Sequence, residues 1–299
     1  MGILKTITEE YFGDTVRKED EINIEGLDVE IVSFTDNNKK FHKKGYKPED
    51  KYNLKKLLER MIEVRGDEGD FNDIDTSDIE YMDSLFENNK NFNGDITGWN
   101  VSNVENMDNM FFDATSFNQP IGKWDVSNVT NMNSMFNWAE SFNQPIGNWD
   151  VSSVKYMVYM FNGAHSFNQP IGDWKVISVE NMSSMFENAT SFNQPIGDWK
   201  FQKVTYMIDM FKDATSFNQP IGNWNVSEVR NMSHMFYFAE SFNQSIGNWD
   251  VSSVENMNNM FDGAKSFNQN LSKWDLTEKE TKDMFNNCPI KDKYKPKIK

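Results

Sequence analysis

Apolar residues recur along most of this chain in a pattern that repeats every 25 positions. Eight tryptophans mark the period, and each opens the same order of apolar and polar residues; they are Trp99, Trp124, Trp149, Trp174, Trp199, Trp224, Trp249 and Trp274. A fixed period in the twenties is typical of arrays in which each unit buries its apolar face against its neighbours. The pattern therefore predicts a stack of coils.

The unit from Trp124 to Asn148 shows what each coil is expected to contain. Its apolar residues are spaced 3, 3, 1 and 3 apart, at Val129, Met132, Met135, Phe136 and Ala139. This spacing places them on one face of a helix of about three turns. Ser127 stands just before the run, where its hydroxyl is expected to cap the first free N–H groups of the helix.

The residues around each tryptophan indicate a short strand. Ile121, Trp124, Val126 and Val129 follow the order I-x-x-W-x-V-x-x-V, which is the apolar spacing of a leucine-rich repeat. Parallel strands repeat more closely than packed helices, so the array is expected to curve with the strand side concave. An asparagine in every unit, such as Asn143, is expected to form an amide ladder between coils.

The predicted fold class is an α/β solenoid, a leucine-rich-repeat-like right-handed array of short parallel strands and helices with an N-terminal α+β cap. Residues 1–70 lack the repeat. They are expected to form this cap, with a hairpin that turns at residues 36–38 and a helix over residues 54–62 that ends at Gly66. Residues 71–290 form the repeat solenoid, and residues 291–299 are a basic, solvated C-terminal tail.

The repeated segments SFNQPIGNWDVSSV and NMNNMF resemble the 25-residue repeat of BspA-like leucine-rich-repeat surface proteins. The resemblance covers residues 71 to 290. It implies a surface or adhesion protein, found in bacteria and some large DNA viruses, and most members of that family lack an assigned activity.

Charge and targeting signals restrict the function and the location. The formal charge of −16 argues against nucleic acid as a partner, because phosphate binding needs clustered Lys and Arg. The first 17 residues never reach the apolar run of a secretory signal, and no later segment is long and apolar enough for membrane insertion. The resemblance implies the cell surface, whereas the chain as written is expected to be cytoplasmic.

Catalytic chemistry has little support in the sequence. Three histidines and one cysteine are scattered through it, at His42, His165, His234 and Cys288. No catalytic residue, metal ligand or cofactor is predicted from these positions, and the chain is predicted not to be an enzyme. The enzyme alternative requires a site in the first 70 residues or a pocket with converging titratable groups.

Departures from the repeat consensus point to a binding surface in the central units. Lysines replace aspartates after two tryptophans, and bulky residues replace Asn or Ser nearby. The candidate binding residues are Tyr156, Tyr159, Lys175, Ile177, Lys200, Gln202, Lys203, Tyr206 and Ile208. Exposed aromatic groups suit a protein partner, and neutral drift of a tolerant repeat is the competing explanation. A second group of large residues comprises Phe112, Trp138, Tyr237 and Phe238.

These features predict a non-enzymatic module that binds a protein or a glycan, with a role in surface adhesion. The alternative is a structural component of a surface layer or virion, in which arrays self-associate laterally or end to end.

Overall fold

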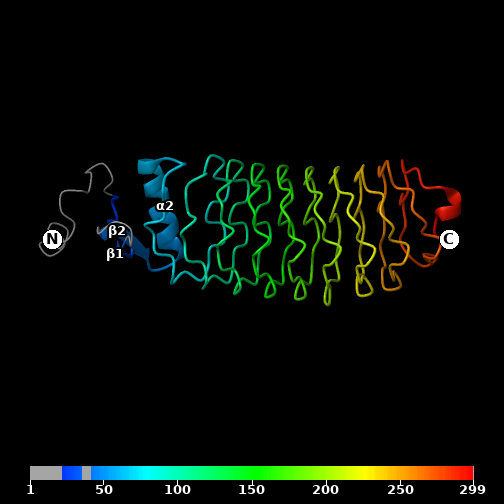
Figure 1. The fold of residues 1–299 in the computed structure, drawn as a ribbon, viewed down its shortest axis with the longest axis horizontal. Coiled ribbons are helices and arrows are strands. Elements are labelled where there is room, and N and C mark those ends of the chain that lie inside the picture. Colours follow the sequence, from blue (N-terminus) through cyan, green and yellow to red (C-terminus); the bar gives the residue numbers. More distant parts are fainter. Residues whose placement is uncertain (1–21, 36–41, 299) are drawn as a thin grey trace, which may run out of the picture.

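The computed structural model describes residues 22–35 and 42–298. The expectations about a secretory signal in residues 1–17 and a turn at residues 36–38 lie outside these residues. In Figure 1 the chain forms a row of similar coils, with a hairpin and a helix at one end and a short 3-10 helix at the other. Each unit is named below by its tryptophan, so that the Trp149 coil contains residues 149–173.

The predicted N-terminal hairpin and helix are present. Strands β1 (Val29–Thr35) and β2 (His42–Pro48) pair antiparallel, and helix α2 spans Lys51–Arg65. The helix begins where the Asp50 side chain accepts a hydrogen bond from the Asn53 N–H, and it ends at Gly66, whose φ of 77° suits glycine. Its buried face consists of Leu54, Leu57, Leu58 and Met61.

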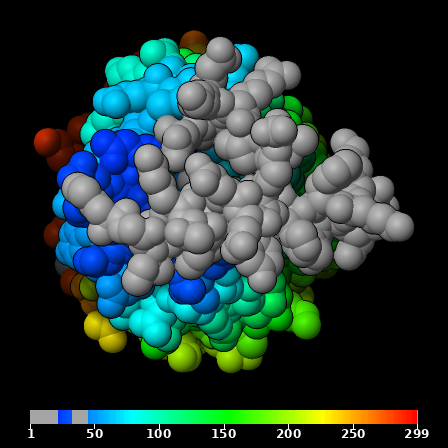
Figure 2. Space-filling view, turned by 90° about the vertical axis from the view of Figure 1, so that its left-hand side faces the viewer, coloured from blue at the N-terminus to red at the C-terminus, as the bar shows by residue number. Residues whose placement is uncertain are grey.

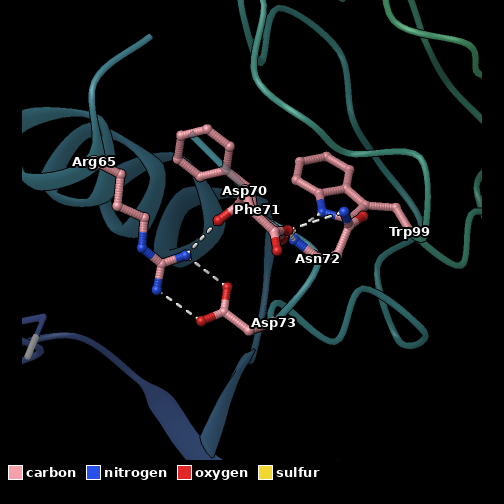
Figure 3. A network of polar contacts seen from close by, with 6 residues as sticks. All are labelled: Arg65, Asp70, Phe71, Asn72, Asp73 and Trp99. Carbon is pink, nitrogen blue, oxygen red and sulfur yellow. Dashed lines mark hydrogen bonds and ion pairs between the residues drawn. The ribbon is translucent and has the colours of Figure 1, made fainter. Parts of the chain in front are cut away.

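An ion pair and backbone hydrogen bonds attach this cap to residues 70–75. These residues begin the first coil, which precedes the Trp99 coil and lacks a tryptophan. Figure 3 shows the Arg65 guanidinium donating to both carboxylate oxygens of Asp73, at 2.7 Å each, and to the Asp70 carbonyl oxygen. The Asp73 side chain is only 4% exposed. Strand β2 continues the contact, because the Tyr46 N–H donates to the Asp73 carbonyl oxygen at 2.8 Å. Helix α2 and strand β2 thus contact the start of the array and cover its N-terminal end.

The helix predicted in each repeat is wrong. In the Trp124 coil the N–H groups of Met132 and Ser134 donate to carbonyl oxygens of the next coil, at 3.0 and 2.8 Å. Ser134 and Trp138 have φ values of 52° and 57°, in the left-handed region that interrupts a right-handed helix. Three-residue turns replace the helix, and they keep Met132, Met135 and Phe136 buried.

The strand predicted around each tryptophan is also absent. Among the described residues, regular strands occur only in the N-terminal hairpin, and neighbouring coils are joined by isolated parallel bridges such as Asn131 to Tyr156. These bridges lie seven residues after the tryptophan. Backbone hydrogen bonds still join each coil to its neighbours over one part of the unit, at alternating residues from Thr130 to Trp138 in the Trp124 coil.

The array was expected to curve because packed helices on one side would be spaced more widely than strands on the other. The described coils contain no such helix, so this cause of curvature is missing. The coils in Figure 1 follow a nearly straight line. Seen from the N-terminal side in Figure 2, later coils lie behind earlier ones with small offsets. Within residues 22–35 and 42–298 there is no concave strand face that would gather the candidate binding residues.

Aromatic rings fill the interior in continuous files. Phe161, Phe186 and Phe211 come from successive coils, and their ring centroids are 5.7 and 5.6 Å apart with nearly parallel planes. The tryptophans form a second file, in which Trp149 and Trp174 stack at 6.5 Å. All eight tryptophans that open the units are at most 4% exposed. Because each ring packs on its copy in the next coil, burial grows with every added unit.

Polar side chains complete the contacts between coils. The predicted amide ladder is confirmed: the Asn143 N–H donates to Asn118 Oδ1 at 2.9 Å, and Gln144 Nε2 donates to the Asn118 carbonyl oxygen at 2.9 Å. The predicted serine cap is wrong. The Ser127 N–H and hydroxyl both donate to the Asp125 carboxylate, which closes a side-chain turn, and no helix follows.

The C-terminal segment packs on the array, whereas a solvated tail was expected. Residues Asp292–Tyr294 form the 3-10 helix η3. The Leu271 N–H donates to the Tyr294 carbonyl oxygen, and the Leu276 N–H donates to the Lys297 carbonyl oxygen. The segment therefore satisfies backbone groups at the last coil, which the alternating lysines of the sequence do not reveal.

Gly147→Ala is expected to lower the free energy of unfolding by about 1–3 kcal/mol, because it overpacks the contact between two coils. A Cβ atom at this position would lie 2.5 Å from the Pro170 carbonyl oxygen. Chemical denaturation measures the loss. The adjacent exposed residue provides the control, since Asn148→Ala is expected to stay within about 0.5 kcal/mol of the wild type. Equal stability of the two variants would contradict the close approach.

Candidate functional site

Tyr156 and Tyr206 lie in one column of the stack. The parallel bridges run Tyr156 to Asn181 and Asn181 to Tyr206, so one coil separates the two tyrosines. Their side chains are 42% and 43% exposed. Other coils carry Asn at this position, as in Asn106 and Asn131. The structure thus brings together two exposed rings that stand 50 residues apart in the sequence.

The tyrosines remove a local turn that asparagine makes. Asn131 Oδ1 accepts a hydrogen bond from the Asn133 N–H two residues later. Tyrosine offers no such acceptor, so in the next coil the Val158 N–H donates instead to Asn133 Oδ1, at 2.8 Å. No hydrogen bond of the Ile208 N–H is found within the described part of the chain. Tyr206 therefore replaces a local stabilising contact with an exposed ring.

Lys175 and Lys200 occupy a second column, directly after the tryptophans. The preceding coil carries Asp150, whose carboxylate accepts a hydrogen bond from the Ser152 N–H. Hydrogen bonds from Ser152 hold the pKa of Asp150 below its usual value, and the positive charge of Lys175 contributes to the shift. Lys175 and Lys200 cannot make this turn. Their coils carry Ile177 and Gln202 at the serine position, and both residues are exposed.

The lysine and tyrosine columns stand on either side of a turn in the chain. In the Trp174 coil the turn is closed by a hydrogen bond from the Val179 N–H to the Val176 carbonyl oxygen, at 3.3 Å. In the Trp199 coil Phe201 replaces valine, and its ring meets Trp224 edge-on at 4.9 Å. A small recess opens there, lined by Phe201, Gln202, Val204, Asn225, Ser227 and Glu228.

The remaining predicted residues divide between these columns. Lys203 is exposed beside Gln202 at the turn, and Ile208 is half-buried after Tyr206. Tyr159 is 42% exposed and has a φ of 57°, at the position that Asn109 fills in the Trp99 coil and Ser134 in the Trp124 coil. We call the exposed surface formed by Tyr156, Tyr159, Lys175, Ile177, Lys200, Lys203 and Tyr206 the central face.

Several cations stand on the central face and next to it, and the acidic Glu180 lies among them in the column of Lys155. Lys155, Lys175, Lys200, Lys203 and Arg230 are all exposed, and none forms an ion pair among the described residues. In contrast, Lys212 bonds to Glu187 at 2.8 Å. These five cations stand on a chain whose formal net charge is −16.

Sequence reasoning missed the left-handed positions. Each coil has two residues with positive φ, and these columns are rich in Asn, Asp, Ser and Gly. That composition at a fixed spacing is the signal for left-handed backbone. Trp138 and Phe238 occupy such positions although neither is small or polar, and Tyr159 occupies one in the other left-handed column.

Titratable groups gather at Glu187, Asp209, Lys212 and His234. Lys212 Nζ lies 2.8 Å from Glu187 Oε1 and 3.8 Å from Asp209 Oδ1, and burial raises the pKa of Asp209. No group of three His, Cys, Asp or Glu residues in the described part of the chain is arranged to hold a metal ion. Burial raises the pKa of the Cys288 thiol, whose sulfur lies 3.5 Å from the Phe267 carbonyl oxygen. None of the helices at residues 22–35 and 42–298 has the length and apolar character needed to cross a bilayer.

The stacked 25-residue units define this chain as a repeat protein. Three overlapping segments, residues 53–149, 120–219 and 195–296, match the family described as Mycoplasma protein of unknown function, DUF285. Together they cover most of the chain, which therefore belongs to this family. No curated protein and no solved structure matches the chain.

Proposed function

We propose that this chain is a non-catalytic binding module in which the stacked coils act as a solenoid scaffold and the central face contacts a macromolecular partner. The observation that carries the proposal is the pair Tyr156 and Tyr206, two exposed rings in one column at a position where asparagine is the usual residue. Exposed tyrosines provide a large contact area with little side-chain entropy to lose. The free lysines around them favour an acidic protein or glycan.

The proposal includes a relationship to BspA-like surface proteins and a role in adhesion at the cell surface. The support for it is the repeated motif, in which W-D-V-S-x-V-x-x-M-x-x-M-F precedes S-F-N-Q-P-I-G.

The test replaces the tyrosines with the residue that other coils carry. Tyr156→Asn together with Tyr206→Asn is expected to weaken partner binding by about thirtyfold, if each ring contributes about 1 kcal/mol. Stability is expected to be unchanged or higher, because asparagine restores the side-chain turn. Binding to partners from surface extracts of the native host is measured by affinity capture and then by titration.

Tyr81→Asn is the matched control, since Tyr81 lies in the same column with 48% exposure but three coils before Tyr156. It is expected to leave binding unchanged. Equal loss from the control and the double variant would exclude the central face as the site. Lys175→Asp with Lys200→Asp then tests whether the lysine column belongs to the same surface, because it restores the consensus residue and reverses the charge.

The second candidate function is structural assembly, in which arrays associate with one another. The free lysines and the many acidic residues of the other coils favour it, because unlike charges on two copies attract. Sedimentation at increasing protein concentration distinguishes the two functions. Reversible self-association that Lys175→Asp with Lys200→Asp abolishes would favour assembly.

A further inference from the structure

Trp138 holds a backbone conformation that large residues rarely adopt. Its φ is 57°, and it belongs to a left-handed column that otherwise contains Asn88, Asp113, Gly163, Asn188, Asp213, Phe238, Gly263 and Asn287. Asn, Asp and Gly tolerate this region, whereas a large aromatic residue there is strained. Such strain is concentrated at functional positions in proteins. Trp138 is therefore a candidate functional residue, because folding does not require a large aromatic side chain at this position.

The indole ring of Trp138 lies flat over the backbone of the next coil. A Cβ atom on Gly163 would stand 2.6, 2.7 and 3.0 Å from Cδ2, Cε3 and Cε2 of the ring. These three contiguous atoms surround the ring fusion, so their similar distances place Gly163 beneath one face of the indole. The Trp138 side chain is nevertheless 38% exposed. One face of the indole thus packs on Gly163, and the rest of the ring is accessible to solvent.

Polar groups border this ring. The His165 ring meets it edge-on, with centroids 5.6 Å apart and planes at 79°. His165 Nδ1 lies 3.0 Å from the Asn188 carbonyl oxygen, so Nδ1 is the donor in this contact, and in the neutral ring Nε2 is then an acceptor. The neighbouring Asn137 is 7% exposed, and its buried Oδ1 has no hydrogen-bond partner in the described chain.

A related arrangement recurs four coils further along, at a half-buried Phe238 whose ring also packs against Tyr237, with centroids 4.7 Å apart. Phe238 has a φ of 50°, and its Cδ1, Cγ and Cε1 atoms lie 2.8, 2.8 and 2.9 Å from the position of a Cβ atom on Gly263. Glu240 bonds there to Lys265 of the next coil at 2.6 Å, and the equivalent residues beside Trp138 are Glu140 and His165. Four coils correspond to about 20 Å along the array by the usual spacing of strands.

We propose that Trp138 is a stacking platform for a sugar ring and that Phe238 repeats it, so that a neutral glycan binds lengthwise along this edge of the array. A pyranose has an apolar C–H face and hydroxyl groups around its rim. That division of polarity matches an exposed indole that is in edge contact with the His165 ring and has the exposed Glu140 two residues along the chain. A protein partner would insert an anchor residue into a pocket on this chain. The indole lies flat on Gly163 and forms no such pocket.

This glycan edge goes beyond the proposed function, because it contains none of the residues of the central face. The competing explanation is that a second copy of the chain covers this edge, since its own aromatic residues have the same spacing of four coils.

Tryptophan fluorescence tests the proposal directly. Trp138 is the one tryptophan of nine that is not buried, so iodide quenching of the wild type reports on this ring. The probes are three neutral hexasaccharides: cellohexaose, chitohexaose and maltohexaose. We expect at least one of them to protect Trp138 from iodide with a saturable dependence on its concentration.

Two variants of Trp138 separate the ring from the fold. Trp138→Asn is expected to fold, because Asn88 and Asn188 occupy this column, and to weaken calorimetric binding of the protective saccharide by about tenfold or more. Trp138→Phe keeps a ring and is expected to retain most of the affinity. Tyr206→Asn, which alters the central face, is expected to bind the saccharide normally.

Three results would overturn the proposal. The first is that none of the hexasaccharides protects Trp138 at millimolar concentration. The second is that Trp138→Asn binds the saccharide as tightly as the wild type. The third is that protection depends on protein concentration without added saccharide, which would assign the edge to a second copy of the chain.

Discussion

Replacing Phe186 with alanine is expected to lower the free energy of unfolding by about 3–5 kcal/mol, as for large aromatic residues in other protein cores. The Phe186 ring is fully buried, and it stacks on Phe161 and Phe211 of the adjacent coils and on Phe192 of its own coil, at 4.1 Å. Hydrogen bonds fix the coils on both sides of the ring. The cavity therefore cannot collapse, and urea denaturation followed by circular dichroism measures the loss.

Phe285→Ala provides the matched control at the end of the array. Phe285 occupies the equivalent position in the last coil, where it is half-buried and stacks on Phe261 alone among the described rings, at 5.7 Å. Its replacement is expected to lose less than half as much stability. Equal losses at the two positions would contradict the view that stabilisation arises from neighbours on both sides.

Replacing Arg65 with alanine is expected to lower the free energy of unfolding by about 3–5 kcal/mol, because it leaves the Asp73 carboxylate buried without its cation. The two side chains are 16% and 4% exposed, and both carboxylate oxygens accept hydrogen bonds from the guanidinium (Figure 3). The effect is expected to be concentrated at the N-terminal end. Hydrogen exchange should show faster opening of α2 and β2 than of the central coils.

Lys56→Ala is the control on the same helix, since Lys56 is exposed and makes no polar contact among the described residues. It is expected to change stability by less than about 0.5 kcal/mol. The double variant Arg65→Ala with Asp73→Ala is expected to recover part of the loss, because it removes the uncompensated charge. A double variant that loses the sum of the two single effects would show that the pair is not coupled.

The sequence predicts which residues face the interior of each coil, but it predicts the wrong backbone for them. The spacing of Met132, Met135 and Phe136 fits one face of a helix, and three-residue turns satisfy the same spacing. The deciding residues are those at the left-handed positions, such as Asn109 and Asp113, whose types tolerate positive φ. A helix interior would not favour these residues.

The columns of the candidate site follow from the period alone, whereas their relative placement does not. A 25-residue repeat is enough to stack Tyr156, Asn181 and Tyr206 in one column. The turn that separates this column from Lys175 depends on how each coil bends at Val176 and Val179. The strain at Trp138 has a signal in the sequence, because most other units carry Asn, Asp or Gly at that position, and the positive φ explains the signal.

Near-identical coils create a hazard for folding that the N-terminal cap counters. Because the amide ladder and the aromatic files repeat from unit to unit, a chain that pairs one unit out of step satisfies almost every contact except those at its ends. Arg65 and Asp73 have no counterpart in the other coils. Their ion pair forms only when the first unit lies against α2, so it selects the correct alignment among many that are otherwise similar in energy.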